Sequence, residues 1–502
     1  MLYNLIKQKI LVVLDFLIVC LFSCLLSFVL HIILSFDLRV LFEEPRFFAF
    51  FTKNIWKSAK ECVIIIWYSF CAFFIRELIF IFERKQIADG VFFSRITDRR
   101  FKANRISVSL FTDFDALPRA DCALAAYALS ECCALYPDYS KLSAALLDLY
   151  DASISTSTYS RWDKRCTEIV GSALDDRYAL SGEKLERELA LLMCECLFRP
   201  KAENGAFDEK VTEMMRAELI DSIDSVINDK SRYAAYRAAK SAFVGEPDEL
   251  AASGTHEDAE KVTAQSAYAA YREILETARV EIFAAGCSDF ADTEEIFARE
   301  FSAINRRCSI TELGSKPSAL KKEPAYVEDE FDMKQAILRM YFKAPELADH
   351  EANIFLARIL GGMTTSRFFT NIREKQSLCY YCSSLIDRSK RTLTCYAGIE
   401  PKNKKRAEQA ILKELRDICE NGVTEEEILQ AKLELKNQYK AIYDSASALA
   451  VWYFIQLPYG KFLTPEEFAE TLEPVTSERI QNAARMYTLD TVYTLSGKNS
   501  EE

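Results

Sequence analysis

The stretch ILGGMTTSRFFTNIREKQSLCYYCSS, residues 359–384, decides how the second half of this chain is interpreted. Its first residues close an apolar helix on Gly361 and Gly362. A second helix is expected at 365–375, and a strand follows at 378–387. The stretch therefore predicts a helix–helix–strand unit of an α/β protein.

Two pairs of residues in this stretch are candidates for chemistry. Cys379 and Cys382 form a C-x-x-C pair, and Arg373 lies seven residues before Tyr380. Redox dithiols sit at helix N-termini, where the helix dipole stabilises a thiolate, whereas this pair falls in a predicted strand. Residues three apart in a strand point to opposite faces, so we expect neither cysteine to support the other, and no redox or metal role. Four further cysteines are expected to be buried in helices without partners: Cys132, Cys133, Cys194 and Cys196.

The same order of elements occurs earlier in the chain. The segment ADCALAAYALSECCALYPDYSKLSAALLDLYDAS, residues 120–153, echoes residues 348–384 at a nearly constant offset. Residues 311–330 contain two prolines, a Gly-Ser and a charge cluster without hydrophobic periodicity, which indicates a linker. The chain is therefore predicted to hold two similar α/β domains, at 88–310 and 331–502.

Residues 1–86 differ in composition from the rest of the chain, because Phe, Leu and Ile dominate and alanine is scarce. Apolar runs at 10–36 and 62–82 are long enough to cross a bilayer as helices, so one prediction is a transmembrane hairpin. The other is upstream sequence translated from a misplaced start. In that case, a chain starting near residue 88 should be soluble and folded.

Composition narrows the class of function. The net charge of -12 argues against a nucleic-acid surface, which needs a basic patch. The 16 cysteines are scattered through 502 residues, which is typical of free thiols in a reducing compartment and favours the cytoplasm. His31, His256 and His350 lie too far apart for one helix to present two of them to a metal, so each is expected to be structural or solvated.

Residues 359–381 resemble the second-domain signature of the pitrilysin/insulinase superfamily of zinc peptidases, in the two-domain branch that includes mitochondrial processing peptidase. The signature has a helix ending in Gly-Gly, a Ser-Arg-hydrophobic-Phe turn, Arg-Glu-Lys, and a tyrosine seven residues after that arginine. Its residues here are Gly361, Gly362, Ser366, Arg367, Phe368, Arg373, Glu374, Lys375 and Tyr380. The resemblance covers about residues 88–498 and implies two homologous domains, each a mostly antiparallel sheet packed with helices.

Active members of this superfamily carry His-x-x-Glu-His on the first long helix of the first domain. The resemblance places that motif at 126–130, where this chain reads AYALS, without either histidine or the glutamate. A third ligand in relatives could correspond to Glu213 or Glu218, but one carboxylate does not hold zinc. The reaction needs a zinc-activated water and a base, so the chain is not expected to be a peptidase alone or to bind a cofactor.

In active relatives, the arginine binds substrate and the tyrosine hydroxyl stabilises the oxyanion, facing the zinc across a chamber. The resemblance thus implies that Arg373 and Tyr380 act in trans, in a heterodimer whose homologous partner binds zinc and cleaves a peptide or an unfolded protein. On spacing alone, the two residues would instead be a helix-surface arginine and a strand-core tyrosine.

The chain most resembles the zinc-less bacterial homologue associated with aminopentanol modification of elongation factor P. The alternative function is a non-catalytic scaffold or peptide-binding module. Such a module could be tethered to a membrane through residues 10–36 and 62–82, as the core subunits of respiratory complexes in this superfamily are.

Overall fold

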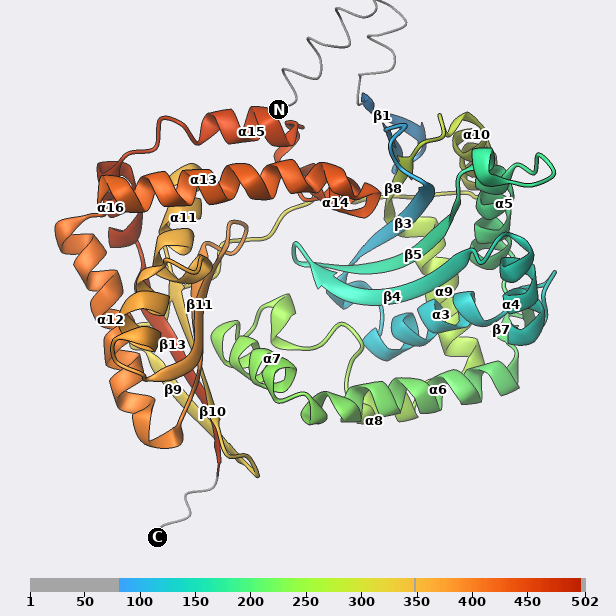
Figure 1. Ribbon diagram of the computed structural model, residues 1–502. Coiled ribbons are helices and arrows are strands. Elements are labelled where there is room, and N and C mark those ends of the chain that lie inside the picture. The colour runs from blue at the N-terminus through green and yellow to red at the C-terminus, as the bar shows by residue number, and fades with distance from the viewer. Residues whose placement is uncertain (1–80, 347–348, 498–502) are drawn as a thin grey trace, which may run out of the picture. The chain divides into compact units, whose positions relative to one another are not determined.

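The computed structural model describes residues 81–346 and 349–497. By its internal contacts the chain divides into two compact units, residues 1–79 and 80–502, and every described residue belongs to the second. That unit contains two large mixed sheets with helices, so the predicted α/β class is confirmed (Figure 1).

The first sheet is formed by residues 81–286 and has six strands, in the order β1-β2-β8-β3-β5-β4. The strands are β1 (Ile81–Ala88), β2 (Val91–Thr97), β3 (Ala103–Asp113), β4 (Ser153–Arg161), β5 (Lys164–Leu174) and β8 (Arg279–Gly286). Neighbouring strands are antiparallel except β2 and β8, which are parallel. A two-strand hairpin, β6 (Ala202–Glu203) with β7 (Ala206–Phe207), stands apart from this sheet.

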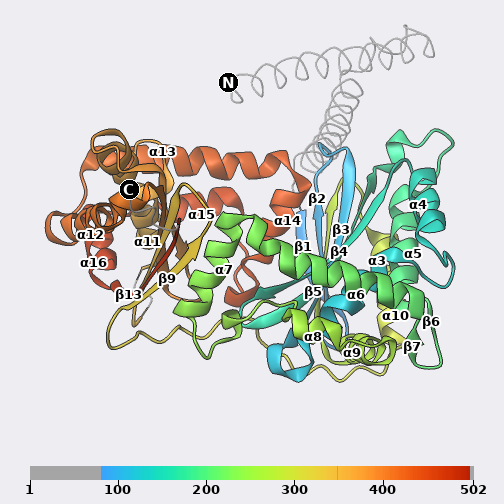
Figure 2. The ribbon, with the colours of Figure 1, turned by 90° about the horizontal axis from the view of Figure 1, so that it is seen from below.

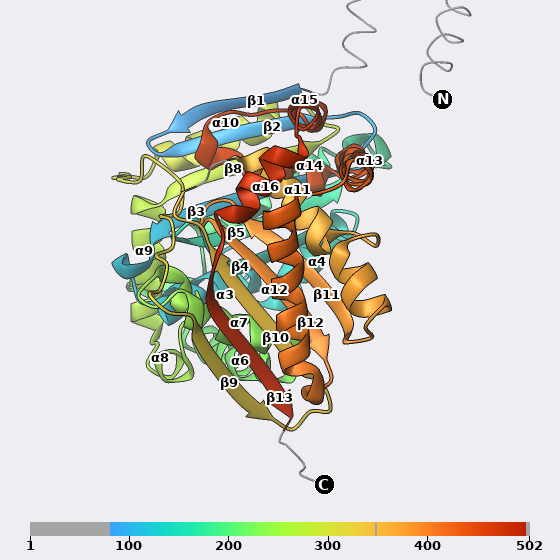
Figure 3. The same cartoon turned by 90° about the vertical axis from the view of Figure 1, so that its left-hand side faces the viewer.

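The second sheet repeats this topology. Its strands are β9 (Ala325–Phe331), β10 (Ala336–Lys343), β11 (Cys379–Asp387), β12 (Thr392–Ile399) and β13 (Thr488–Gly497). Their order is β11-β12-β10-β13-β9, and only β13 and β9 are parallel (Figure 3). Without β1, the first sheet has the same order read from β4 to β2. The two sheets are therefore built on one plan.

Helices of the same half cover one face of each sheet. The first half has α3 (Arg119–Glu131), α4 (Tyr139–Asp148), α5 (Leu185–Phe198), α6 (Glu209–Asp224), α7 (Lys230–Ala242), α8 (His256–Glu260), α9 (Ala264–Thr277) and α10 (Ala291–Ser302). The second half has α11 (His350–Ala357), α12 (Lys404–Asn421), α13 (Glu425–Ala441), α14 (Ala446–Phe454), α15 (Pro465–Thr471) and α16 (Ser477–Arg485). α3, α5 and α9 share a buried core with the first sheet, and α11, α12 and α16 share one with the second.

The other face of the first sheet is covered by α14, which comes from the second half of the chain (Figure 2). The ring of Phe454 packs against Trp162, with ring centroids 5.2 Å apart, and against Phe111 and Phe283 at 5.9 and 5.8 Å. Burying aromatic rings in this way contributes strongly to the apolar core.

The second sheet is covered in the reciprocal manner by α7, from the first half (Figure 1). The small side chains of Ala234 and Ala238 let α7 lie close to Tyr341 and Tyr493 of the sheet. Arg237 of α7 also forms an ion pair of 2.6 Å with Asp329 of β9, which joins the helix to the sheet. Each sheet thus takes one helix from the other half.

Two helices of the second half begin with a capping box. Thr424 and Glu427 form a capping box at the start of α13, and Thr464 and Glu467 form another at α15, with Pro465 at the first helical position. Such starts are local, because the cap side chain and the backbone group it bonds lie three residues apart.

Two boundaries predicted from the sequence, that of the linker and that of the first domain, fall within strands of the structure. β9, Ala325–Phe331, lies mostly within the predicted linker 311–330, and the linker reading of those residues is wrong, because they pair with β13. β1, Ile81–Ala88, crosses the predicted start of the first domain at residue 88 and pairs with β2.

The candidate transmembrane segments at 10–36 and 62–80 lie outside the described residues; only the last two positions of the second run, 81 and 82, are described, and they start β1. Within 81–346 and 349–497, no helix has the length and apolar character needed to cross a membrane.

We expect the loss of β1 to destabilise the protein, because Arg84 of β1 pairs at 2.6 Å with Glu281, whose side chain is fully buried. Arg279, at 3.0 Å, would remain as the partner of Glu281. The loss of one hydrogen-bonded partner of a charged group costs about 1.5–3 kcal/mol. In urea, a chain starting at residue 80 should therefore unfold at a clearly higher midpoint than one starting at residue 88. Equal midpoints would contradict this role of β1.

Candidate functional site

Arg373 lies near the end of a π-helical turn, Phe368–Glu374, which Phe368 and Ile372 anchor by burying their side chains in the core. Its guanidinium lies 4.8 Å from the centre of the Phe369 ring. Its one ion pair within the described residues is a 3.7 Å contact with the adjacent Glu374, and its side chain is 44% exposed. The guanidinium is therefore oriented by the turn yet open to a ligand or a partner.

A preceding glycine sets the position of this turn. A Cβ on Gly361 would lie 2.7 Å from the backbone nitrogen of Ser384, so only glycine allows the end of the α11 segment to approach β11 this closely. Ser384 donates a hydrogen bond of 2.7 Å to the Ala357 carbonyl, and Ser383 donates one of 2.9 Å to the Gly361 carbonyl. The Gly-Gly of the sequence signature thus fixes the turn against the strand that follows it.

Tyr380 lies on β11, the edge strand of the second sheet, and its side chain is 50% exposed. Among the described residues its hydroxyl has no hydrogen-bond partner, and the ammonium of Lys402 lies in its neighbourhood. The alternative reading of a strand-core tyrosine is therefore wrong, because the ring stands outside the core.

The chain folds back between these two residues. Ser377 donates a backbone hydrogen bond of 3.1 Å to the Arg373 carbonyl, and Leu378 donates one of 3.1 Å to the Ile372 carbonyl. Arg373 also acts electrostatically on Cys379, the residue before Tyr380. The turn and the start of β11 thus carry both side chains on one short, hydrogen-bonded segment.

Their spacing predicts that Cys379 and Cys382 point to opposite faces of the strand. That prediction is wrong. Cys379 pairs with Ile399 and Tyr381 with Gly398, so Tyr380 is an extra residue in a β-bulge. The bulge turns Cys379 and Cys382 to the same side, where their thiols are hydrogen-bonded. That bond lowers the pKa of Cys379, whereas burial and the neighbouring thiol raise the pKa of Cys382.

A second thiol pair also departs from expectation. Cys133 and Cys196 are hydrogen-bonded to each other, a contact that lowers the pKa of Cys133 to about 6 and raises that of Cys196. The prediction that these cysteines lack partners is wrong, because Cys133 lies beyond the end of α3, in a bridge to Pro200 next to the end of α5.

The segment expected to match the zinc motif, residues 126–130, lies on α3. Ala126 and Leu129 are buried, and Ser130 forms a 2.9 Å hydrogen bond with Thr156 of β4. Within the part of the chain that the structure describes, no group of three or more His, Cys, Asp or Glu side chains is close enough to hold a metal.

The two glutamates named as third-ligand candidates, Glu213 and Glu218, are exposed on α6, which packs against α3. Burial raises the pKa of Glu131 at the end of α3, and the nearby charge of Glu218 adds to that rise. Glu218 therefore lies near Glu131 at the end of that helix, but among the described residues these two carboxylates have no third side chain with which to hold a metal.

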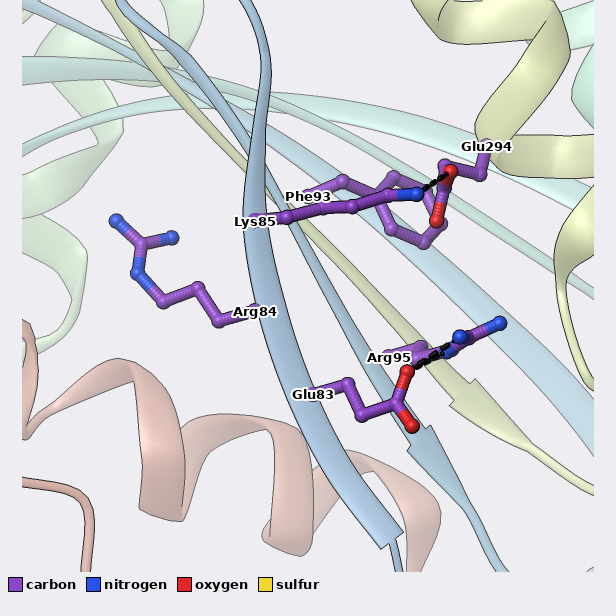
Figure 4. Close-up of a pocket in the computed structure, with 6 residues that line it drawn as sticks. All are labelled: Glu83, Arg84, Lys85, Phe93, Arg95 and Glu294. Atoms are coloured by element: carbon purple, nitrogen blue, oxygen red, sulfur yellow. Dashed lines mark hydrogen bonds and ion pairs between the residues drawn. The ribbon is translucent and has the colours of Figure 1, made fainter.

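A cavity of about 350 Å³ beside β1 was not anticipated from the sequence (Figure 4). Its lining residues are Glu83, Arg84, Lys85, Phe93, Arg95 and Glu294. Each of its cations is already neutralised by a carboxylate of this chain: Lys85 by Glu294, Arg95 by Glu83, and Arg84 by Glu281. The cavity therefore offers no free charge to a ligand.

Comparisons with known proteins agree with this architecture. Residues 261–435 match the family described as Peptidase M16 inactive domain. The probable inactive metalloprotease YmfF of Bacillus subtilis is 26% identical over 365 residues, which cover 72% of this chain and 85% of that protein. The uncharacterized zinc protease YmxG of the same organism is 28% identical over 184 residues, or 44% of its length.

Solved structures show the same fold. A conserved protein from Enterococcus faecalis V583 superposes with a TM-score of 0.76 at 25% identity, covering 84% of this chain and all of that one. A peptidase M16 inactive domain from Pseudomonas fluorescens superposes with a TM-score of 0.70 at 17% identity, covering 84% of this chain and 99% of that one.

The missing His-x-x-Glu-His motif and the match to an inactive peptidase domain agree that this chain is an inactive metallopeptidase homologue. The signature at 359–381, the curated relatives and the fold all point to the same group of peptidase-like proteins. In sequence and in fold, this chain is therefore similar to the inactive homologues of M16 peptidases.

Proposed function

We propose that this chain is the non-catalytic subunit of a peptidase heterodimer and that it supplies Arg373 and Tyr380 to the zinc site of a homologous partner. One observation carries the proposal. A chain without zinc ligands on α3 holds an open guanidinium and an unpartnered phenol on one short segment at a sheet edge. A structural role alone would not require either group to be free.

The two side chains suit the chemistry of peptide cleavage. Zinc bound by the partner would supply an activated water. The Tyr380 hydroxyl can donate a hydrogen bond to the oxyanion that forms at the cleaved carbonyl, where donors have their largest effect. Arg373 can bind a carbonyl or carboxylate of the same peptide, since its guanidinium presents several donors in one plane.

The proposal extends to cellular context. The described cysteines form no disulfides, which favours the reducing cytoplasm. The resemblance to the zinc-less homologue associated with elongation factor P suggests that the heterodimer handles a peptide or protein connected with that modification.

Mixing tests the central claim. The full chain and its zinc-bearing homologue from the same genome are purified separately, and each is assayed with a quenched fluorescent peptide, alone and together. We expect cleavage only from the mixture, abolished by a zinc chelator, and a single co-eluting complex on gel filtration. Full activity of the homologue alone, with no complex formed, would leave this chain without the proposed role.

A further inference from the structure

A cavity of about 180 Å³ lies where α14 covers the first sheet. Arg105 of β3, Arg161 of β4 and Glu168 of β5 supply its polar side, and Phe283 and Phe454 supply an apolar side. Its volume corresponds to about six water molecules, which is enough for one small polar group and a short aliphatic arm.

The two arginines of this cavity lack partners. The Nε atoms of Arg105 and Arg161 are shielded from solvent and have no hydrogen bond. Within residues 81–346 and 349–497, no carboxylate lies within 4 Å of either guanidinium, although Arg161 lies 5.1 Å from the centre of the Trp162 ring. A buried Nε–H group without an acceptor is unfavourable, so an anion that enters the cavity gains hydrogen bonds as well as charge attraction.

Glu168 lies close enough to interact electrostatically with both arginines, but it is not within 4 Å of either, and other side chains donate hydrogen bonds to its carboxylate. Ser109 donates a 3.1 Å hydrogen bond to it, and the Tyr159 hydroxyl is a second donor. Burial raises the pKa of Glu168, which disfavours its charged form. The cavity therefore has two cations facing one carboxyl group, so its lining has an excess of positive charge.

A third arginine lies outside the cavity lining, near Arg161, and the acidic Asp387 acts on the same tyrosine, Tyr459. Arg388 of the second half lies 3.6 Å above the Tyr459 ring, and its Nε is also without a partner. Burial raises the pKa of Tyr459, and Arg388 and Arg161 both oppose that rise, which places the two cations near the same ring. These cations thus lie together in a chain whose net charge is -12.

We infer that Arg105 and Arg161 form a subsite for a carboxylate group of a bound peptide, a role that rests on the peptide handling proposed above. The planar guanidinium matches a carboxylate with two parallel hydrogen bonds, and the rings of Phe283 and Phe454 suit the aliphatic arm that carries it. The carboxylate belongs either to an aspartate or glutamate side chain or to the peptide's C-terminus.

Binding is measured on the full chain without its partner, by fluorescence polarisation. The probes are short labelled peptides of one sequence: a parent with internal glutamates and a free C-terminus, a glutamine version, a C-terminal amide, and a version with both changes. Arg105→Gln and Arg161→Gln should each weaken binding of the parent about tenfold or more. If only the glutamine version of the peptide loses affinity, the bound group is the side-chain carboxylate. If only the C-terminal amide loses affinity, the bound group is the C-terminal carboxylate.

A matched control is Arg95→Gln, which removes a cation from β2 of the same sheet, where Glu83 already neutralises it. This variant should bind the parent peptide as the unaltered chain does. Arg161→Lys keeps the charge and should recover part of the affinity, which a folding defect would not do. Unchanged binding by both glutamine variants overturns the subsite, as does equal binding of the peptide with neither carboxylate. Because no partner and no cleavage are involved, this outcome is independent of the mixing assay.

Discussion

Replacing Tyr380 by phenylalanine is expected to lower kcat of the mixed complex about a hundredfold or more, with little change in KM. The hydroxyl is proposed to bond the oxyanion, which exists only near the transition state, so its loss should not affect substrate binding. Because that hydroxyl has no partner among the described residues and its ring is 50% exposed, the substitution should leave folding intact.

Arg373→Ala should act differently, by raising KM, because the guanidinium is proposed to bind substrate in the ground state as well. The matched control is Tyr326→Phe. Tyr326 is also an exposed strand tyrosine, but it lies on β9, at the opposite edge of the same sheet, where its hydroxyl bonds Glu408. If the double variant Arg373→Ala, Tyr380→Phe keeps full activity with the partner, the proposed function fails.

A second large effect is expected at Lys390, in the turn between β11 and β12. Its side chain is 5% exposed and pairs with three carboxylates of the first half: Asp163, Glu246 at 3.1 Å and Asp248 at 2.9 Å. Burial opposes its charge, but the hydrogen bond to Asp163 and the nearby carboxylates outweigh burial and raise the pKa of Lys390. The lysine thus joins two halves that are distant in sequence.

Lys390→Met should reduce the free energy of unfolding by about 3–5 kcal/mol, because it leaves three carboxylates clustered without their cation. Urea unfolding at neutral pH measures the loss. The control is Lys402→Met, which removes a solvent-exposed lysine whose partner Glu400 is half exposed, and which should leave the midpoint unchanged. Similar midpoints for the two variants would contradict the role of Lys390.

The pH dependence follows from the direction of the Lys390 shift. A lysine whose pKa is higher in the folded than in the unfolded state contributes its full stability below the unfolded value, about 10.4, and loses it as pH rises through the folded value. The difference in stability between the unaltered chain and Lys390→Met should therefore be constant near neutral pH and shrink only in strong alkali.

Features set by neighbours in sequence could be predicted. The capping boxes at Thr424 and Thr464 need only residues three apart, and the strand that contains Tyr380 follows from a run of apolar and aromatic residues. The mixed α/β class follows from the alternation of such runs with helical periodicity. The missing zinc motif could also be recognised, because it concerns residue types at a fixed spacing.

Features set by distant partners could not be predicted. Ala325 belongs to a strand because it lies opposite Thr491 of β13, and residues 325–331 give no strong signal of their own. The bulge at Tyr380 depends on the register with β12, so spacing alone placed the two thiols on the wrong faces. The cavity of Arg105 and Arg161 needs four strands of the first sheet and a helix from the second half of the chain.

The exchange of α7 and α14 has a consequence for how the halves are held together. Since each half completes the other's sheet, the peptide bonds at 311–324 are not their main connection. A chain cut there would behave as an obligate pair of fragments, each lacking one sheet face when alone. A gene split at that point would accordingly have to be co-expressed as two polypeptides for either product to fold.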